Sequence, residues 1–209
     1  MKEKAFKIIV IISSIWMFFI GGFGLYYTIF FSSNTLHNPQ VIKIFISSFS
    51  SDMVYILLGL FCLLKLFTNK TLMLKIVSVI LVVISLIRDL TFVLSIGSFY
   101  GWRNIEFLFV DQRWRSLLPN VFLMILTVFL ICVCVNLFKT FIGKKTSFIL
   151  SAILFLLGLI ISFSSIVLIT SSSSRYVLND FIVNKMRYIC YLPLMYLALK
   201  PINKKDEIK

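Results

Sequence analysis

Between residues 57 and 83 the chain reads LLGLFCLLKLFTNKTLMLKIVSVILVV. Two apolar runs flank a short polar turn, which is bracketed by Lys65, Lys70 and Lys75. Apolar helices of about 20 residues are long enough to cross the hydrocarbon core of a bilayer, and lysine collects at their cytoplasmic ends. The pattern therefore predicts an antiparallel pair of transmembrane helices joined by a cytoplasmic turn.

The remainder of the chain repeats this pattern. Of its 209 residues 60% are hydrophobic, and the mean hydropathy is +1.02, which is far above the range of soluble domains. We predict an all-α, polytopic membrane helix bundle in which residues 1–209 form a single transmembrane domain. The six expected spans cover residues 8–31, 43–67, 72–99, 117–138, 147–170 and 177–199. The sixth crosses the membrane only if its polar first half is included, because its unbroken apolar part is too short.

Lysine placement predicts the orientation of the bundle. An up-and-down path brings most of the lysines to one side: Lys2, Lys4, Lys7, Lys65, Lys70, Lys75, Lys139, Lys144, Lys145, Lys200, Lys204, Lys205 and Lys209. The positive-inside rule then places both termini in the cytoplasm, as expected for a multi-pass protein of the cell (plasma) membrane. The net charge of +13 is thereby explained by topology and contact with membrane lipids, and no nucleic-acid partner is expected.

Four charges are expected inside the membrane at one depth. Asp52, Arg88 and Arg187 each lie thirteen residues from a lysine that ends their segment, and Asp89 adjoins Arg88. That separation corresponds to about 20 Å within a core of about 30 Å, where a charge costs at least about 2.5–3.5 kcal/mol and needs a partner. Because Asp52 and Arg88 are equally far from Lys70, we expect an ion pair between them. Asp89 would then turn toward Arg187 or another helix.

Polar side chains at helical spacing define a candidate ligand site in the outer half of the bundle. The outer segment 100–116 alternates aromatic and charged residues, which is typical of an interfacial anchor or of a lid over such a site. Its aromatic faces would suit a ring or a choline-like cation, and its arginines an anion. The predicted ligand-binding residues are Asp52, Tyr55, Arg88, Asp89, Trp102, Arg113, Trp114, Arg115, Asn184, Arg187 and Tyr191. The alternative interpretation is that these arginines pair with acidic residues and fasten the loops to the bundle.

Small residues predict where the helices approach one another closely. Ser14, Gly21, Gly24 and Thr28 follow one stripe of the first segment, and Gly158 belongs to a similar stripe of the fifth. Small side chains allow membrane helices to pack tightly, so we expect helix contacts at these positions. Asn136 near the lysine-bearing end of the fourth segment is expected to bond across helices or to reach the interface.

The sequence contains little that indicates catalysis. Its four cysteines all lie in apolar segments without a C-x-x-C pair, and its one histidine stands in a polar turn, which excludes a multi-histidine metal site. We therefore expect no cofactor, no metal and no enzymatic activity. An intramembrane enzyme that uses carboxylates, Asp52 with Asp89 or Asp180, is the remaining catalytic alternative.

The overall plan resembles that of the substrate-binding S components of bacterial vitamin importers, in its six helices, cytoplasmic termini and outer binding loops. The resemblance covers the number of spans and no individual residue, and it implies binding of a small molecule from outside. The first functional hypothesis is accordingly a protein that binds or carries a small polar, anionic or zwitterionic molecule, or a lipid headgroup. The alternative is a non-catalytic membrane partner, such as a transporter accessory subunit, an immunity protein or an assembly protein. A charge-balanced polar layer fits this alternative, whereas the excess of loop arginines fits the first.

Overall fold

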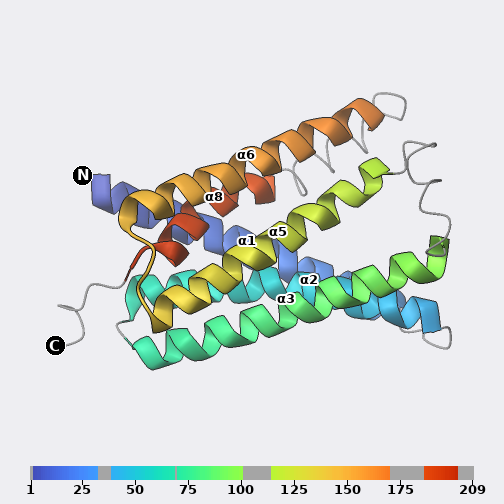
Figure 1. The fold of residues 1–209 in the computed structure, drawn as a ribbon, viewed down its shortest axis with the longest axis horizontal. Coiled ribbons are helices and arrows are strands. Elements are labelled where there is room, and N and C mark those ends of the chain that lie inside the picture. Colours follow the sequence, from blue (N-terminus) through green and yellow to red (C-terminus); the bar gives the residue numbers. More distant parts are fainter. Residues whose placement is uncertain (1, 33–38, 69, 101–113, 170–185, 202–209) are drawn as a thin grey trace.

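The computed structural model describes residues 2–32, 39–68, 70–100, 114–169 and 186–201. Within these ranges all the regular secondary structure is α-helical, which confirms the all-α part of the prediction. The helices pack side by side with their long axes roughly aligned (Figure 1). They are α1 (Lys2–Ser32), α2 (Pro39–Phe67), α3 (Thr71–Tyr100), α5 (Trp114–Phe138), α6 (Lys144–Ile169) and α8 (Met186–Leu199).

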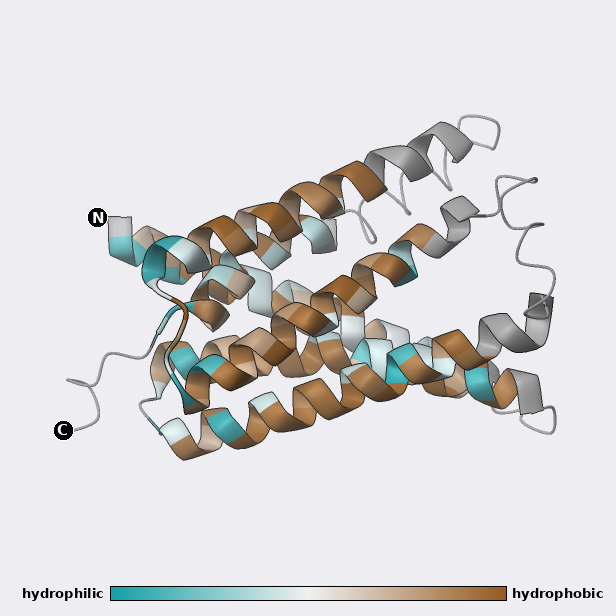
Figure 2. Cartoon of the chain, viewed as in Figure 1, coloured by the Kyte–Doolittle hydropathy of each residue, from teal (hydrophilic) through white to brown (hydrophobic). Residues whose placement is uncertain are grey.

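Five of these helices, α1, α2, α3, α5 and α6, are long and apolar enough to cross a membrane. Apolar residues predominate along the described parts of these helices (Figure 2). Each of the five also has large apolar side chains that are exposed on its surface. Such a surface would aggregate in water but is solvated by lipid. The chain is therefore a membrane-embedded helix bundle.

Both the start of α1 and the end of α8 lie at one end of the bundle, together with the turns between α2 and α3 and between α5 and α6 (Figure 1). We call this the lysine end, because it carries Lys65, Lys70, Lys75, Lys139, Lys144, Lys145 and Lys200. The arrangement brings the lysines together as predicted. That the lysine end faces the cytoplasm remains a prediction.

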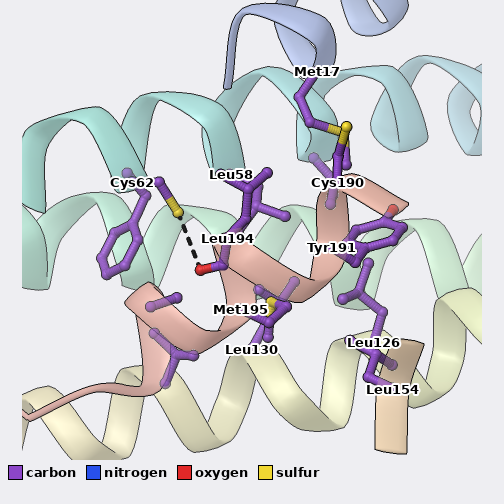
Figure 3. Close-up of a cluster of buried hydrophobic side chains, with 14 of the residues drawn as sticks. Met17, Leu58, Cys62, Leu126, Leu130, Leu154, Cys190, Tyr191, Leu194 and Met195 are labelled. Carbon is purple, nitrogen blue, oxygen red and sulfur yellow. Dashed lines mark hydrogen bonds between the residues drawn. The ribbon is translucent and has the colours of Figure 1, made fainter. Parts of the chain in front are cut away.

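The short helix α8 lies at the centre of the lysine-end half, packed against α1, α2, α5 and α6. Its residues Leu194, Met195 and Leu199 are fully buried. Figure 3 shows Leu194 and Met195 among side chains of the surrounding helices, with the Cys62 thiol donating to the Leu194 carbonyl at 3.4 Å. The 14 described residues of α8 extend about 21 Å, which is short of a full span. They cover only the second half of the sixth predicted span, because residues 170–185 lie outside the described part, so a sixth crossing of the membrane remains a prediction.

Polar side chains of three helices hold the last turn of α8. Lys65 of α2 donates to the Ala198 carbonyl at 2.8 Å and also to that of Lys200. Asn136 of α5 and Ser147 of α6 donate to the Leu199 carbonyl at 2.8 and 3.1 Å. The carbonyls of a helix C-terminus have no partner within the helix, so these bonds fix where α8 ends. The prediction that Asn136 bonds across helices is confirmed.

Close packing at small residues is also confirmed. A methyl group on Gly21 would lie 2.7 Å from the Asp52 carbonyl oxygen of α2, and one on Gly59 would lie 3.0 Å from the Ser14 carbonyl oxygen of α1. On α6, a methyl group on Gly158 would lie 2.7 Å from the Tyr188 ring of α8. These glycines therefore set the distances of α1 from α2 and of α6 from α8.

Candidate functional site

The largest fully buried side chain in the described part of the chain is a charged one, Arg88 of α3. It is 2% exposed and lies against α5. Its Nη2 donates to the Leu123 carbonyl at 2.5 Å and to the Thr127 hydroxyl at 2.7 Å. Arg88 is therefore held between two membrane helices and is not turned toward lipid.

Asp89, the next residue along α3, neutralises Arg88. Its Oδ1 accepts from Arg88 Nε at 2.9 Å and from Nη2 at 2.8 Å. Thr127 closes a ring, because its hydroxyl accepts from Arg88 and donates to Asp89 Oδ2 at 2.6 Å. The Asp89 side chain is 14% exposed, so the ion pair is shielded from solvent and the attraction between its two charges is only weakly screened.

One nitrogen of the Arg88 guanidinium takes no part in this network. Nε and Nη2 have acceptors, whereas Nη1 is buried and has no hydrogen-bond partner among the described residues. Leaving a buried donor of a charged group unpaired costs more than about 1–3 kcal/mol. In the structure, Arg88 therefore has donor capacity left for an acceptor.

Asp52 does not pair with Arg88, and this prediction is wrong. The Asp52 carboxylate turns instead toward α1, where it accepts from the Thr28 hydroxyl at 3.3 Å. It occupies the space left by Gly24, since a methyl group there would overlap the carboxylate. The two charges sit at similar depth but face opposite neighbours, α1 and α5, because depth along a helix does not fix direction around its axis.

The predicted binding residues Tyr55 and Tyr191 are both buried, with exposures of 3% and 1%. Tyr191 packs with Tyr188 against Phe122 of α5, at ring-centroid distances of 5.4 and 4.9 Å from Phe122. Phe122 precedes Leu123, whose carbonyl accepts from Arg88. This aromatic group therefore lies at the same level of α5 as the ion pair.

Several predicted site residues cannot be placed against this geometry. Trp102, Arg113 and Asn184 lie outside the described residues, as does Asp180 of the enzyme hypothesis. Trp114, Arg115 and Arg187 fall in the first turns of α5 and α8, where the backbone alone is described. Their participation in a site stays a prediction.

The sequence did not predict two of the hydrogen-bond partners of these charged residues: Thr127, which bonds to Arg88 and Asp89, and Thr28, which bonds to Asp52. Thr127 lies twelve residues from Lys139, nearly the depth at which Arg88 lies from Lys75, so matching depths across segments would have indicated it. Thr28 was assigned to helix packing alone, although hydroxyls commonly bond across membrane helices. In the described part, no group of three or more histidine, cysteine or carboxylate side chains could hold a metal ion.

Comparison with known proteins adds no constraint on this site. No protein-family model matches the chain, and no curated protein or solved structure is significantly similar to it. The general likeness to vitamin-importer components is thus not accompanied by a match in sequence or structure.

Proposed function

We propose that the protein binds a small anionic or zwitterionic molecule, or a lipid headgroup, at the polar layer around Arg88. One observation carries the proposal: Arg88 is 98% buried among apolar helices, yet its Nη1 has no hydrogen-bond partner in the part of the chain that the structure describes. A residue that served only to fasten α3 to α5 would gain by satisfying that nitrogen as well. A planar guanidinium with free N–H groups is suited to carboxylate or phosphate oxygens.

The surrounding residues support a site of this kind. Asp89 and Thr127 hold the other guanidinium nitrogens, which fixes the direction in which Nη1 points and lowers the entropy lost on binding. Because Asp89 balances the charge of Arg88, the pair itself would favour a zwitterion, and the positive charge that attracts an anion would come from the loop arginines. We propose that Trp102, Arg113, Trp114, Arg115, Asn184 and Arg187 complete the site from the outer segments.

Thermal unfolding of the purified protein in detergent tests this proposal. A ligand that binds the folded state raises the melting temperature, so inorganic phosphate, glycerol phosphate and phosphocholine are added in turn, with glycerol and choline as neutral and cationic controls. We expect at least one of the three phosphates to stabilise the wild type, and the shift to be lost in Arg88→Lys, which keeps the charge but removes the planar fork. Lys43→Gln, a charge change at the opposite end from the lysines, should retain the shift.

The proposal fails if none of the phosphates stabilises the wild type, or if Arg88→Lys and Lys43→Gln respond alike. In that case the partner-subunit hypothesis gains support. It is favoured by the charge balance between Arg88 and Asp89, which leaves no net charge for a ligand. It predicts a discrete cross-linked complex with another membrane protein in native membranes.

A further inference from the structure

A hollow of about 460 Å³ lies between α1, α6 and α8 in the lysine-end half of the bundle. Its lining is largely apolar and includes Ile9 of α1, Phe148 of α6 and Ile189 of α8. These three side chains are 49–58% exposed, so the hollow opens sideways toward the bilayer. It differs in this respect from the fully buried surroundings of Arg88.

A second hollow of about 450 Å³ continues the first at the lysine end, where Lys144 and Lys145 line it. Phe148 and Tyr196 border both hollows. The Tyr196 ring stands edge-on to Phe6 at 5.5 Å and to Phe148 at 6.0 Å, which marks the junction between them. An apolar groove thus leads into a basic one.

The two lysines are available to a ligand. Both are exposed, and within the described part of the chain neither forms an ion pair. Other lysines at this end are engaged elsewhere: Lys65 donates to carbonyls of α8, and Lys75 lies 5.2 Å from the centroid of the Phe138 ring. The groove therefore combines an apolar wall with positive charge at the lysine end of the apolar helices.

We propose that this groove binds an anionic phospholipid from the leaflet at the lysine end. One acyl chain lies in the apolar hollow, and the phosphate lies between Lys144 and Lys145. Basic pockets between transmembrane helices recognise anionic headgroups in this way. The acyl chain of the lipid would fill the space beside α8 and so contact both α1 and α6. The site is separate from Arg88, and either proposal stands if the other fails.

Native mass spectrometry of the whole protein in detergent tests this inference, with phosphatidylglycerol and phosphatidylcholine of identical acyl chains as probes. The wild type is expected to bind phosphatidylglycerol preferentially. At about 1 kcal/mol for each lysine near a charged headgroup, Lys144→Gln with Lys145→Gln should lower that preference by about thirtyfold. Lys70→Gln with Lys139→Gln removes the same charge at the same end, outside the groove, and should leave the preference unchanged.

A second pair of variants tests the apolar part. Ile189→Trp fills the hollow and should weaken binding of both lipids. Leu86→Trp is the matched control and should leave lipid binding unchanged. Leu86 has the same 49% exposure as Ile189, and it lies as far from Lys75 as Ile189 lies from Lys200. Equal binding of the two lipids by the wild type, equal losses in both lysine pairs, or unchanged binding in Ile189→Trp would each overturn the proposal. So would a dimer of the protein that Ile189→Trp dissociates, since a second copy would then occupy the groove.

Discussion

Replacing Asp89 with asparagine is expected to destabilise the bundle more than replacing Asp89 and Arg88 together. Asp89 Oδ1 accepts from two nitrogens of Arg88 at 2.8 and 2.9 Å, and Arg88 is 2% exposed. Removing one partner of a buried ion pair strands the other charge and costs about 3–5 kcal/mol. Because asparagine keeps the shape and one acceptor, we expect about 3 kcal/mol for Asp89→Asn, at the lower end of that range.

The double variant Arg88→Gln with Asp89→Asn leaves no stranded charge and loses only hydrogen bonds, at about 1–2 kcal/mol in total. Arg88→Gln alone strands the Asp89 carboxylate and should likewise cost about 3 kcal/mol. The two single losses then exceed the loss of the double variant by several kcal/mol, well beyond the roughly 0.3–0.5 kcal/mol within which independent sites add. Unfolding in mixtures of dodecylmaltoside and sodium dodecyl sulfate, followed by circular dichroism, gives the free energies.

Arg88→Gln combined with Asp52→Asn provides the matched control for this cycle. In the structure these residues face different helices, so their losses should add. Additive losses for Arg88 with Asp89, together with coupling between Arg88 and Asp52, would refute the reasoning and restore the ion pair expected from the sequence.

Three further predictions concern packing, the anchoring of α8, and topology. Gly24→Ala should lower the melting temperature because the methyl group overlaps the Asp52 carboxylate, whereas Gly22→Ala, which meets nothing within 4 Å, should be tolerated; equal melting temperatures would contradict the helix contact. Asn136→Ala removes bonds to the Leu199 carbonyl and to two backbone N–H groups of the turn before α6, so it should cost about 1–3 kcal/mol in the same unfolding assay. Single cysteines labelled in intact cells should react from outside at positions 37 and 175 but not at 70, and external labelling at 70 would reverse the orientation.

The sequence predicted the parts of the fold that depend on position along the chain. Apolar length indicated five helices long enough to span, and helical spacing of small residues indicated the face of α1 that packs closely, although not that its partner is α2. Lysine spacing correctly indicated that Arg88 lies deep in the bundle. The direction in which a side chain points around the helix axis could not be predicted from spacing along the chain, because it depends on which neighbouring helix leaves space for that side chain. Asp52 turned to the space beside Gly24 of α1, and Arg88 reached across to Leu123 and Thr127 of α5.

The anchoring of the end of α8 also could not be derived from the sequence. The bonds that Lys65, Asn136 and Ser147 donate to its last carbonyls come from three separate helices. Such bonds depend on tertiary arrangement, and local sequence patterns do not encode them.

The most direct test of a ligand at Arg88 is the distance from its guanidinium to a bound phosphorus atom. Solid-state NMR measures it as dephasing of arginine ¹⁵N signals by ³¹P, in protein labelled at arginine, reconstituted in lipid-free detergent assemblies and supplied with glycerol phosphate. We predict dephasing of an Nη signal in the wild type that disappears in Arg88→Gln and persists in Arg175→Gln, which removes an arginine that is not assigned to the site. Dephasing that is absent from the wild type, or that survives unchanged in Arg88→Gln, would contradict the proposal.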